Sequence, residues 1–162
     1  MAREPEQLTA KEDERPLASY ATLIGAFSAA VAGFAGWMAR SGRTFPERFE
    51  ARDLTLMTLA THKASRLLAK DRVTGALRAP FTAPQQDSGA GEVEERARGT
   101  GLRRAIGELL TCPYCLGMWL ATLFAAGMTI APRQTRWVAS VLAVHFGSDV
   151  LQVAYKKLED TL

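Results

Sequence analysis

The sequence has only two cysteines and two histidines among its 162 residues, which restricts the chemistry open to it. Two cysteines cannot build the multi-disulfide framework of a small secreted domain. The net charge of +3 is small, and the aromatic residues fall mostly inside apolar stretches instead of among the basic residues. A nucleic-acid-binding surface requires concentrated positive charge, often with interleaved aromatics. We therefore expect no nucleic acid among the partners of this protein.

Charged residues are nearly absent from three long stretches, although they make up 23% of the chain. Residues 17–38 carry no charged side chain over 22 positions, and a helix of about 20 residues spans a hydrocarbon core roughly 30 Å thick. The preceding residues, 1–16, hold more acids than bases, and the apolar stretch is too long for the core of a signal peptide. The first stretch is therefore predicted to be a transmembrane helix.

The other two apolar stretches lie close together near the end of the chain. One runs from Pro113 to Ala131, and the other from Trp137 to Tyr155. Because only a few residues separate them, they are predicted to form an antiparallel transmembrane hairpin.

Residues 52–81 form a more polar segment with helical spacing at its start. Met57, Ala60 and Ala64 fall on one side of a helical wheel, whereas Lys63 and Arg66 fall on the other. Placing each of these two cations in mid-membrane costs about 2.5–3.5 kcal/mol on insertion scales. A basic amphipathic helix lying in the membrane interface avoids this cost. The interfacial helix is the favoured prediction, and a fourth transmembrane helix is the alternative.

The predicted fold is an all-α integral membrane protein with three transmembrane helices and one amphipathic interfacial helix. Residues 82–101 are rich in Gly, Ala, Gln and charge, with Val93 as the one large apolar residue, and are predicted to be a flexible loop. The predicted organisation is a polar tail (1–16), a transmembrane helix (17–38), an interfacial helix and motif region (52–81), the flexible loop (82–101), a short helix with the transmembrane hairpin (102–155), and a tail (156–162).

The distribution of basic residues predicts an orientation in a bacterial cytoplasmic membrane. With three crossings, residues 39–112 and the tail share one side and hold 15 of the 20 Lys and Arg residues. Positively charged loops stay in the cytoplasm. The middle region and the C-terminus are therefore predicted to be cytoplasmic, and the N-terminus to lie outside.

Cys112 and Cys115 stand two residues apart at the predicted start of the second apolar stretch. Pro113 suits the first position of a helix, which places Cys112 at the N-cap, where the helix dipole favours a thiolate. A thiolate pair can supply half of a zinc shell, with His62 as a further ligand, or act as a redox dithiol. The third interpretation is plain packing, because cysteine behaves as a small hydrophobe. A cofactor is not determined by this pattern, and zinc is the metal that it would suit.

Two ionisable residues, His145 and Asp149, lie four positions apart on the third apolar stretch. Such groups inside a membrane usually face the bundle interior and find partners there. Arg66 is predicted as the counter-ion of Asp149, which gives an intramembrane polar network of Arg66, His145 and Asp149. A packing network is favoured over an ion or proton pathway.

Two segments together resemble a known family. Residues 60–81 read ATHKASRLLAKDRVTGALRAPF, and residues 109–119 read LLTCPYCLGMW. They resemble the uncharacterised bacterial membrane family catalogued as domain of unknown function 1360, over about residues 52–155. The positions that carry the resemblance are Arg66, Leu67, Leu68, Asp71, Arg78, Pro80, Phe81, Cys112, Pro113, Cys115, Gly117 and Trp119. The resemblance implies a membrane location and brings no activity with it.

The resemblance also groups Asp71 and Arg78 with the cysteine pair at the cytoplasmic face. Asp71 and Arg78 are seven residues apart, which places them on one helix face if the helix continues to Pro80. An ion pair between them that holds the amphipathic helix in place is the favoured interpretation. A compact site that joins both residues to Cys112 and Cys115 is the alternative.

The function predicted from the sequence is non-enzymatic: a structural, assembly or interaction role in the membrane. The expected partners are the lipid bilayer and either a second copy of the chain or another membrane protein. The first alternative is a membrane thiol–disulfide protein that uses Cys112 and Cys115. A more distant alternative is an ion or proton pathway through His145 and Asp149.

Overall fold

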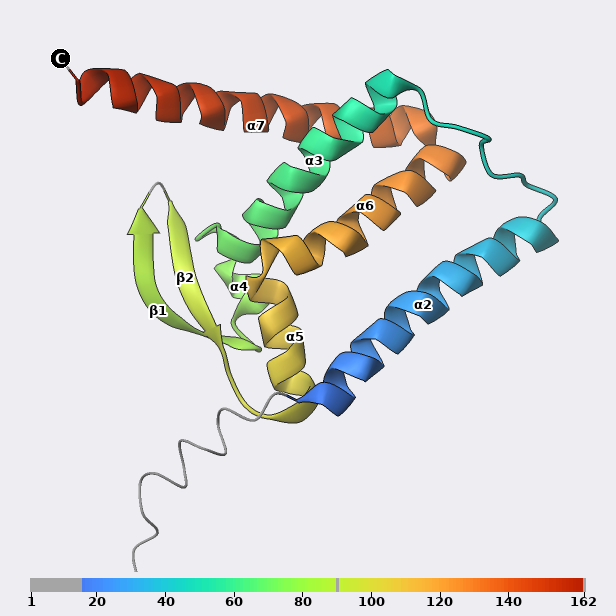
Figure 1. Ribbon diagram of the computed structural model, residues 1–162, viewed down its shortest axis with the longest axis horizontal. Helices are drawn as coiled ribbons and strands as arrows, with labels where there is room; N and C mark the ends of the chain where they lie inside the picture. Colours follow the sequence, from blue (N-terminus) through green and yellow to red (C-terminus); the bar gives the residue numbers. More distant parts are fainter. Residues whose placement is uncertain (1–15, 90, 162) are drawn as a thin grey trace, which may run out of the picture.

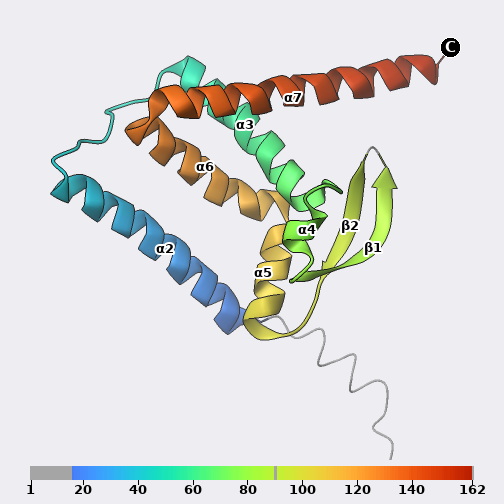
Figure 2. The same ribbon diagram turned by 180° about the vertical axis from the view of Figure 1, so that it is seen from behind.

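The computed structural model describes residues 16–89 and 91–161, so the predicted polar tail lies outside the described residues except for Pro16. Figures 1 and 2 show a group of long helices with a small hairpin at one end. The elements in chain order are α2 (Leu17–Arg40), α3 (Ala51–Lys70), α4 (Gly75–Arg78), β1 (Thr82–Gly89), β2 (Glu92–Ala97), α5 (Gly101–Thr111), α6 (Pro113–Ile130) and α7 (Pro132–Glu159).

The three apolar stretches form the three helices α2, α6 and α7. By length and composition, each is long and apolar enough to cross a membrane. The two later stretches form a helical hairpin, with α6 ending at Ile130 and α7 starting at Pro132, and its crossing of a membrane stays a prediction. Helix α7 begins earlier than predicted because proline is well tolerated at the first helical position, where its missing N–H is not needed.

Helix α3 packs along both α6 and α7 (Figure 1). Its apolar side, Met57, Ala60 and Ala64, forms a buried cluster with Phe124 and Met128 of α6 and Ala139 of α7. The prediction of a helix here is confirmed. The prediction that its apolar face rests on a membrane surface is wrong, because that face is covered by two other helices of the same chain.

Two ion pairs fix the direction of α3 relative to α7. Asp53 accepts hydrogen bonds from Arg136 at 2.7 and 2.9 Å, and Lys63 lies 2.5 Å from Asp149. The residue further along α3, Lys63, pairs with the residue further along α7, Asp149, so the two helices run in the same direction. Because α6 and α7 form a hairpin, α3 runs antiparallel to α6.

Helix α2 runs in the same direction as α6. Near its start, Tyr20 hydrogen-bonds to Glu108 of α5, just before α6, and further along Phe27 meets Trp119 of α6 with ring centroids 5.0 Å apart. The start of α2, the end of α3 and the start of α6 therefore lie at one end of the bundle, and the segment 41–50 lies at the other (Figure 1).

A two-stranded antiparallel sheet occupies the segment that was predicted to be a flexible loop. Strands β1 and β2 pair from Thr82 opposite Ala97 to Gly89 opposite Glu92. Gly89 and Gly91, at the turn, have φ of 81° and 79°, values that glycine adopts without strain. The prediction of a flexible loop over 82–101 is therefore wrong, and the prediction of an all-α fold is confirmed in part, because the chain is mostly helical but also contains this small sheet. Composition misled them, since this hairpin is held mainly by ion pairs to α3 and α4 instead of by a large apolar core.

The short helix α5 packs tightly against the hairpin through Gly107. A Cβ atom at this position would lie 2.5 Å from the backbone oxygen of Phe81 and 2.9 Å from Cβ of Ala97. A short helix is thus present at the start of the region 102–155, as predicted, and its glycine sets how closely the sheet approaches it.

Replacing Gly107 with Ala should lower the free energy of unfolding by about 1–3 kcal/mol, because the added methyl group has to displace backbone atoms. The matched control is Gly117→Ala on α6, where an added Cβ meets no atom within 4 Å. Thermal unfolding of the two purified variants in the same detergent measures the difference. Equal melting temperatures would show that the hairpin is not seated on α5 as described.

Candidate functional site

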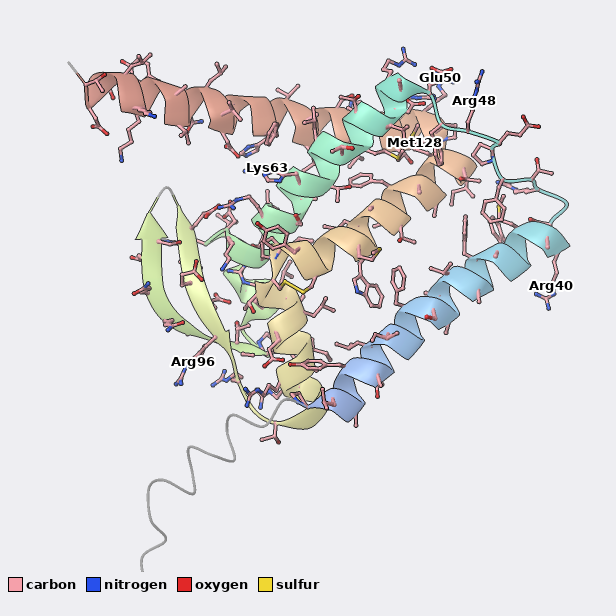
Figure 3. The ribbon with its side chains drawn as sticks, in the orientation of Figure 1. Arg40, Arg48, Glu50, Lys63, Arg96 and Met128 are labelled. Carbon is pink, nitrogen blue, oxygen red and sulfur yellow. A yellow bond between two sulfur atoms is a disulfide. The ribbon has the colours of Figure 1, made fainter. Side chains whose placement is uncertain are left out.

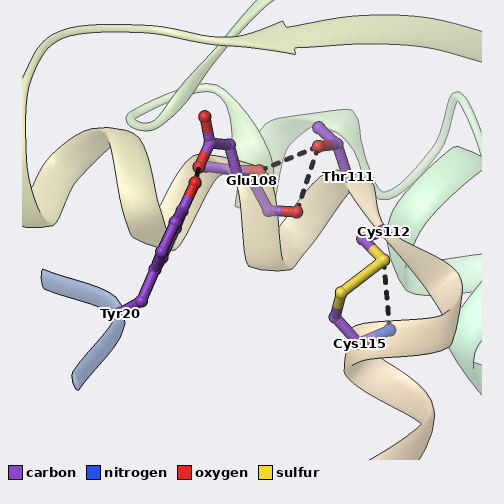
Figure 4. Close-up of a disulfide and its surroundings, with 6 residues drawn as sticks. Tyr20, Glu108, Thr111, Cys112 and Cys115 are labelled. Carbon is purple, nitrogen blue, oxygen red and sulfur yellow. Dashed lines mark hydrogen bonds between the residues drawn. A yellow bond between two sulfur atoms is a disulfide. The ribbon is translucent and has the colours of Figure 1, made fainter. Parts of the chain in front are cut away.

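The cysteine pair lies at the N-terminus of α6 (Figure 4). Cys112 is the N-cap, Pro113 is the first helical residue, and the backbone N–H of Cys115 donates to Sγ of Cys112 at 3.2 Å. The two sulfur atoms form a disulfide. Cys115 is exposed and Cys112 is half-buried. The local placement predicted from Pro113 is thus confirmed, and the pair is in its oxidised form.

An apolar groove of about 380 Å³ runs beside the disulfide, between α2, α5 and α6. Cys115 lines it together with Phe27 and Trp119. Its lining also includes Tyr20, whose hydroxyl donates to Glu108. Arg104 in turn donates to the other oxygen of Glu108 at 3.0 Å. The groove therefore combines a redox-capable sulfur, an apolar wall and a charged hydrogen-bonding group.

The sulfur ligands of the predicted metal site are joined to each other instead of being free. A thiolate is the form of cysteine that binds a metal, and a disulfide offers none. His62, the further ligand considered, packs its ring against Phe146 of α7 with centroids 5.1 Å apart. Within residues 16–89 and 91–161, no group of three or more His, Cys, Asp or Glu side chains is placed to hold a metal ion.

A buried arginine, Arg78, holds the end of α3 to the hairpin. Its side chain is 1% exposed, and all five of its N–H groups donate: to the backbone oxygens of Leu68 and Asp71, to Thr74, and twice to Glu95. Carbonyl groups in the last turn of a helix have no partner inside that helix, and the helix dipole favours a cation there. Arg78 therefore caps α3 and pairs with β2 at once.

The predicted ion pair between Asp71 and Arg78 does not form. Arg78 reaches only the backbone oxygen of Asp71, and its ionic partner is Glu95 at 2.9 Å. The carboxylate of Asp71 instead accepts from the backbone N–H of Val73, because α3 ends at Lys70 and the chain turns there. Since every N–H of Arg78 is taken up within this cluster, it does not join the cysteine pair in one site.

Two more ion pairs join the hairpin to α3. Arg66 contacts Glu92 at 2.6 Å, and Lys70 contacts Glu94 at 2.7 Å. The basic residues of α3 thus follow the acidic residues of β2 along its length. Arg66, predicted as the counter-ion of Asp149, is engaged here instead.

Lys63 is the residue that neutralises Asp149. Its ammonium group lies 2.5 Å from Asp149, and Nδ1 of His145 lies 3.3 Å from the other oxygen of the same carboxylate. Figure 3 shows Lys63 on α3 beside α7. The predicted contact between His145 and Asp149 is confirmed, but Arg66 is replaced by Lys63, whose side chain is only 10% exposed. The helical wheel placed Lys63 on the polar side, where a buried partner was not visible.

Sequence reasoning also missed Tyr20, Glu95 and Glu108 as members of these clusters. The run Glu92-Val93-Glu94-Glu95 falls inside the segment predicted to be a flexible loop. Its spacing does match the basic residues of α3, which is a signal for strand–helix ion pairing. Tyr20 lies in the first apolar stretch, and its partner Glu108 lies 88 residues away in the sequence.

A family model matches residues 56–155, which takes in most of α3, the hairpin, and α5 to α7. The family is described as a protein of unknown function, DUF1360. The chain belongs to this family.

Two curated proteins of Bacillus subtilis (strain 168) are similar to this DUF1360 protein. The sporulation protein YjcA is 30% identical over 107 residues, which cover 64% of this chain and 91% of the relative. The UPF0713 protein YngL is 27% identical over 101 residues, which cover 61% of this chain and 75% of the relative. No solved structure matches the chain.

The Arg78–Glu95 pair makes the stability of the DUF1360 domain depend on pH. Burial raises the pKa of Glu95, but hydrogen bonds from Arg78 and Thr82 and the charge of Arg78 outweigh it, so the pKa lies below its ordinary value. A lowered carboxyl pKa contributes stability that is complete above the unfolded value, about 4.3, and is lost as the pH falls through the folded value.

Replacing Glu95 with Gln should lower the free energy of unfolding by about 3–5 kcal/mol at pH 7, because Arg78 keeps a buried charge without its partner. The difference from the wild type should shrink as the pH falls below about 4. The control is Asp87→Asn, which removes the exposed pair with Arg72 and should cost about 0–1 kcal/mol. Thermal unfolding across pH measures both, and an equal loss in the two variants would contradict the assignment.

Proposed function

We propose that this protein is an integral membrane protein in which four helices, α2, α3, α6 and α7, cross the bilayer. Three of them have the length and composition of transmembrane helices. The fourth, α3, follows from the directions of the others. Helix α2 ends at the end of the bundle where α6 ends, and α3 leads from there back to the level where α6 begins. Its 20 residues extend about 30 Å, the thickness of the hydrocarbon core.

Paired charges support this placement of α3. An isolated Lys at mid-membrane costs about 2.5–3.5 kcal/mol on insertion scales. Lys63 is not isolated, because it faces Asp149 across the helix contact, and Asp53 meets Arg136 near the other end. Charged groups in transmembrane segments characteristically face the bundle interior and pair with one another. The polar face of α3 is therefore compatible with a central position in the bundle.

Four crossings also change the proposed orientation. The start of α2, the hairpin, the cysteine pair and the end of α7 then share one side, which carries most of the Lys and Arg residues. The positive-inside rule assigns this side to the cytoplasm. The prediction of an external N-terminus assumed three crossings. With four crossings, we propose that the N-terminus is cytoplasmic.

Single cysteines introduced into a Cys112→Ser, Cys115→Ser background distinguish four crossings from three. Ser41→Cys lies between α2 and α3, and Ser88→Cys lies in the hairpin. With four crossings, a membrane-impermeant maleimide applied to intact cells should label only Ser41→Cys, and Ser88→Cys should react only after lysis. Identical labelling of the two variants would place α3 on the membrane surface.

The activity that the site supports best is thiol–disulfide exchange by Cys112 and Cys115. The carrying observation is the disulfide at the start of α6, with Cys115 exposed. Disulfides at a cytoplasmic face are usually transient and catalytic or redox-sensing. The stabilisation from a disulfide grows with the length of the loop that it closes, and this one closes one of the shortest. A redox role therefore accounts for the bond better than a structural role.

We propose different tasks for the two sulfurs. A partner thiolate attacks Sγ of Cys112, the Cys112–Cys115 bond breaks, and Cys115 leaves as a thiolate. A second partner thiol, once deprotonated, then attacks the partner sulfur of the mixed disulfide and releases Cys112. Cys112 is suited to be released as a thiolate because it accepts the N–H of Cys115 at a helix N-terminus. In the reverse direction, Cys112 is the nucleophile and Cys115 the resolving thiol.

Replacing Cys115 with Ser should trap a mixed disulfide between Cys112 and its partner, because no resolving thiol remains. Non-reducing electrophoresis of alkylated membranes after mild oxidation detects the product, which reductant must remove. The double variant Cys112→Ser, Cys115→Ser is the control and should trap nothing. Absence of any adduct from Cys115→Ser, with its single thiol reactive to maleimide, would count against exchange.

A membrane assembly or interaction role is the second candidate. It is favoured by the similarity to a protein whose printed name is a sporulation protein. It is also favoured by the last part of α7, where every residue from Leu151 to Asp160 is exposed, so a partner has a free helix to contact.

A further inference from the structure

The groove beside the disulfide has an apolar neighbour further along α2 and α6. A second apolar cavity, of about 560 Å³, lies between α2 and α6 and shares Phe27 and Trp119 with the groove. Its walls include Val31, Phe34 and Leu123. The two cavities follow one another along α2 toward its C-terminal end, and the packed rings of Phe27 and Trp119 lie where they meet. We call the groove and the second cavity together the channel.

We propose that this channel binds a lipid-soluble quinone, which accepts the electrons of the reduced Cys112–Cys115 pair. The headgroup lies in the groove beside Cys115, and the isoprenoid tail follows the cavity past Phe27 and Trp119. The inference rests on the proposed exchange activity and names the oxidant that regenerates its disulfide.

The walls of the channel favour a quinone over a plain acyl chain. The sulfur of Cys115 belongs to a residue that lines the groove, so a ligand there can contact the redox centre. The hydrogen-bonded Tyr20 and Glu108 also line this groove, whereas the second cavity has no charged side chain in its lining. Figure 4 shows Tyr20 and Glu108 on one side of the disulfide. A groove lined by both a redox-capable sulfur and a polar pair, next to a cavity without charged side chains, matches a polar headgroup with a long hydrocarbon tail.

The electron balance of the step is complete. The S–H bonds of Cys112 and Cys115 break, and one S–S bond forms between them, which releases two electrons and two protons. The quinone takes up both at its two carbonyl oxygens and becomes a hydroquinone. Quinones serve as the final oxidant of a membrane dithiol relay in the bacterial periplasm, so the chemistry is established between these two classes of group. In this scheme Cys112 exchanges with the protein partner, and Cys115, which lines the groove, contacts the quinone.

The test uses the full chain, reduced and then freed of reductant in detergent, with a short-tailed quinone as the probe. The loss of free thiols and the formation of hydroquinone are measured together. One quinone should be reduced for each chain that is oxidised. Ile24→Trp fills the groove from α2, where Ile24 is 66% exposed and lines it. Leu17→Trp, on the same helix and 71% exposed outside the groove, is the matched control. Ile24→Trp should slow oxidation by quinone about tenfold or more, and Leu17→Trp should leave it unchanged.

Exchange with oxidised glutathione separates this inference from the proposed function. If both tryptophan variants exchange with glutathione like the wild type and only Ile24→Trp slows quinone reduction, the channel is the quinone site. If the wild type exchanges with glutathione but quinone does not oxidise it faster than buffer, the quinone proposal is overturned and exchange stands. Equal quinone rates in all three proteins would also overturn it, with the channel then a lipid contact. If neither oxidant closes the disulfide, both proposals fail.

Discussion

The pairing of charges between α3 and its neighbours is the constraint on which the rest of this fold depends. Asp53 meets Arg136, Lys63 meets Asp149, and Arg66 and Lys70 meet acids of β2. The first two pairs fix the direction and register of α3 against α7, and the last two bring the hairpin to its end. Because these charges are neutralised, a polar helix can occupy the centre of a group of apolar ones. Without these partners, the same helix would face water or the membrane surface, and α6 would lose the neighbour that covers Phe124 and Met128.

The sequence was sufficient for those elements whose signal is local. Uncharged runs located α2, α6 and α7, and Pro113 located the cysteine pair at a helix start. It was insufficient wherever a charge had a distant partner. Lys63 and Arg66 were both counted as costs of insertion, although one pairs with a residue 86 positions away and the other with a residue 26 positions away. The hairpin was missed for the same reason, since its acidic run suggests disorder until the basic face of α3 is placed beside it.

The candidate site shows the same division. The spacing of Cys112 and Cys115 allowed packing, metal and redox interpretations, and the disulfide favours the redox one. The apolar groove could not be foreseen, because its walls come from α2, α5 and α6, and their arrangement depends on Tyr20 reaching Glu108 and Phe27 reaching Trp119. A resemblance in the motif residues identified the family, but the α2 wall of the groove lies outside the matched region of 56–155. Members of the family that share the cysteine pair can therefore differ in what lies beside it.

The distance in sequence between the partners of α3 has a consequence for biogenesis. In the proposed topology, the ribosome delivers α3 to the membrane well before α7, whose Arg136 and Asp149 neutralise Asp53 and Lys63 from 83 and 86 residues further on. During that interval α3 carries unpaired charges, and an insertion machinery that judges each segment alone would reject it. Stable insertion of α3 is then tied to completion of the C-terminal hairpin. A chain truncated before α7 would leave α3 at the membrane surface and would start α6 from the wrong side of the bilayer.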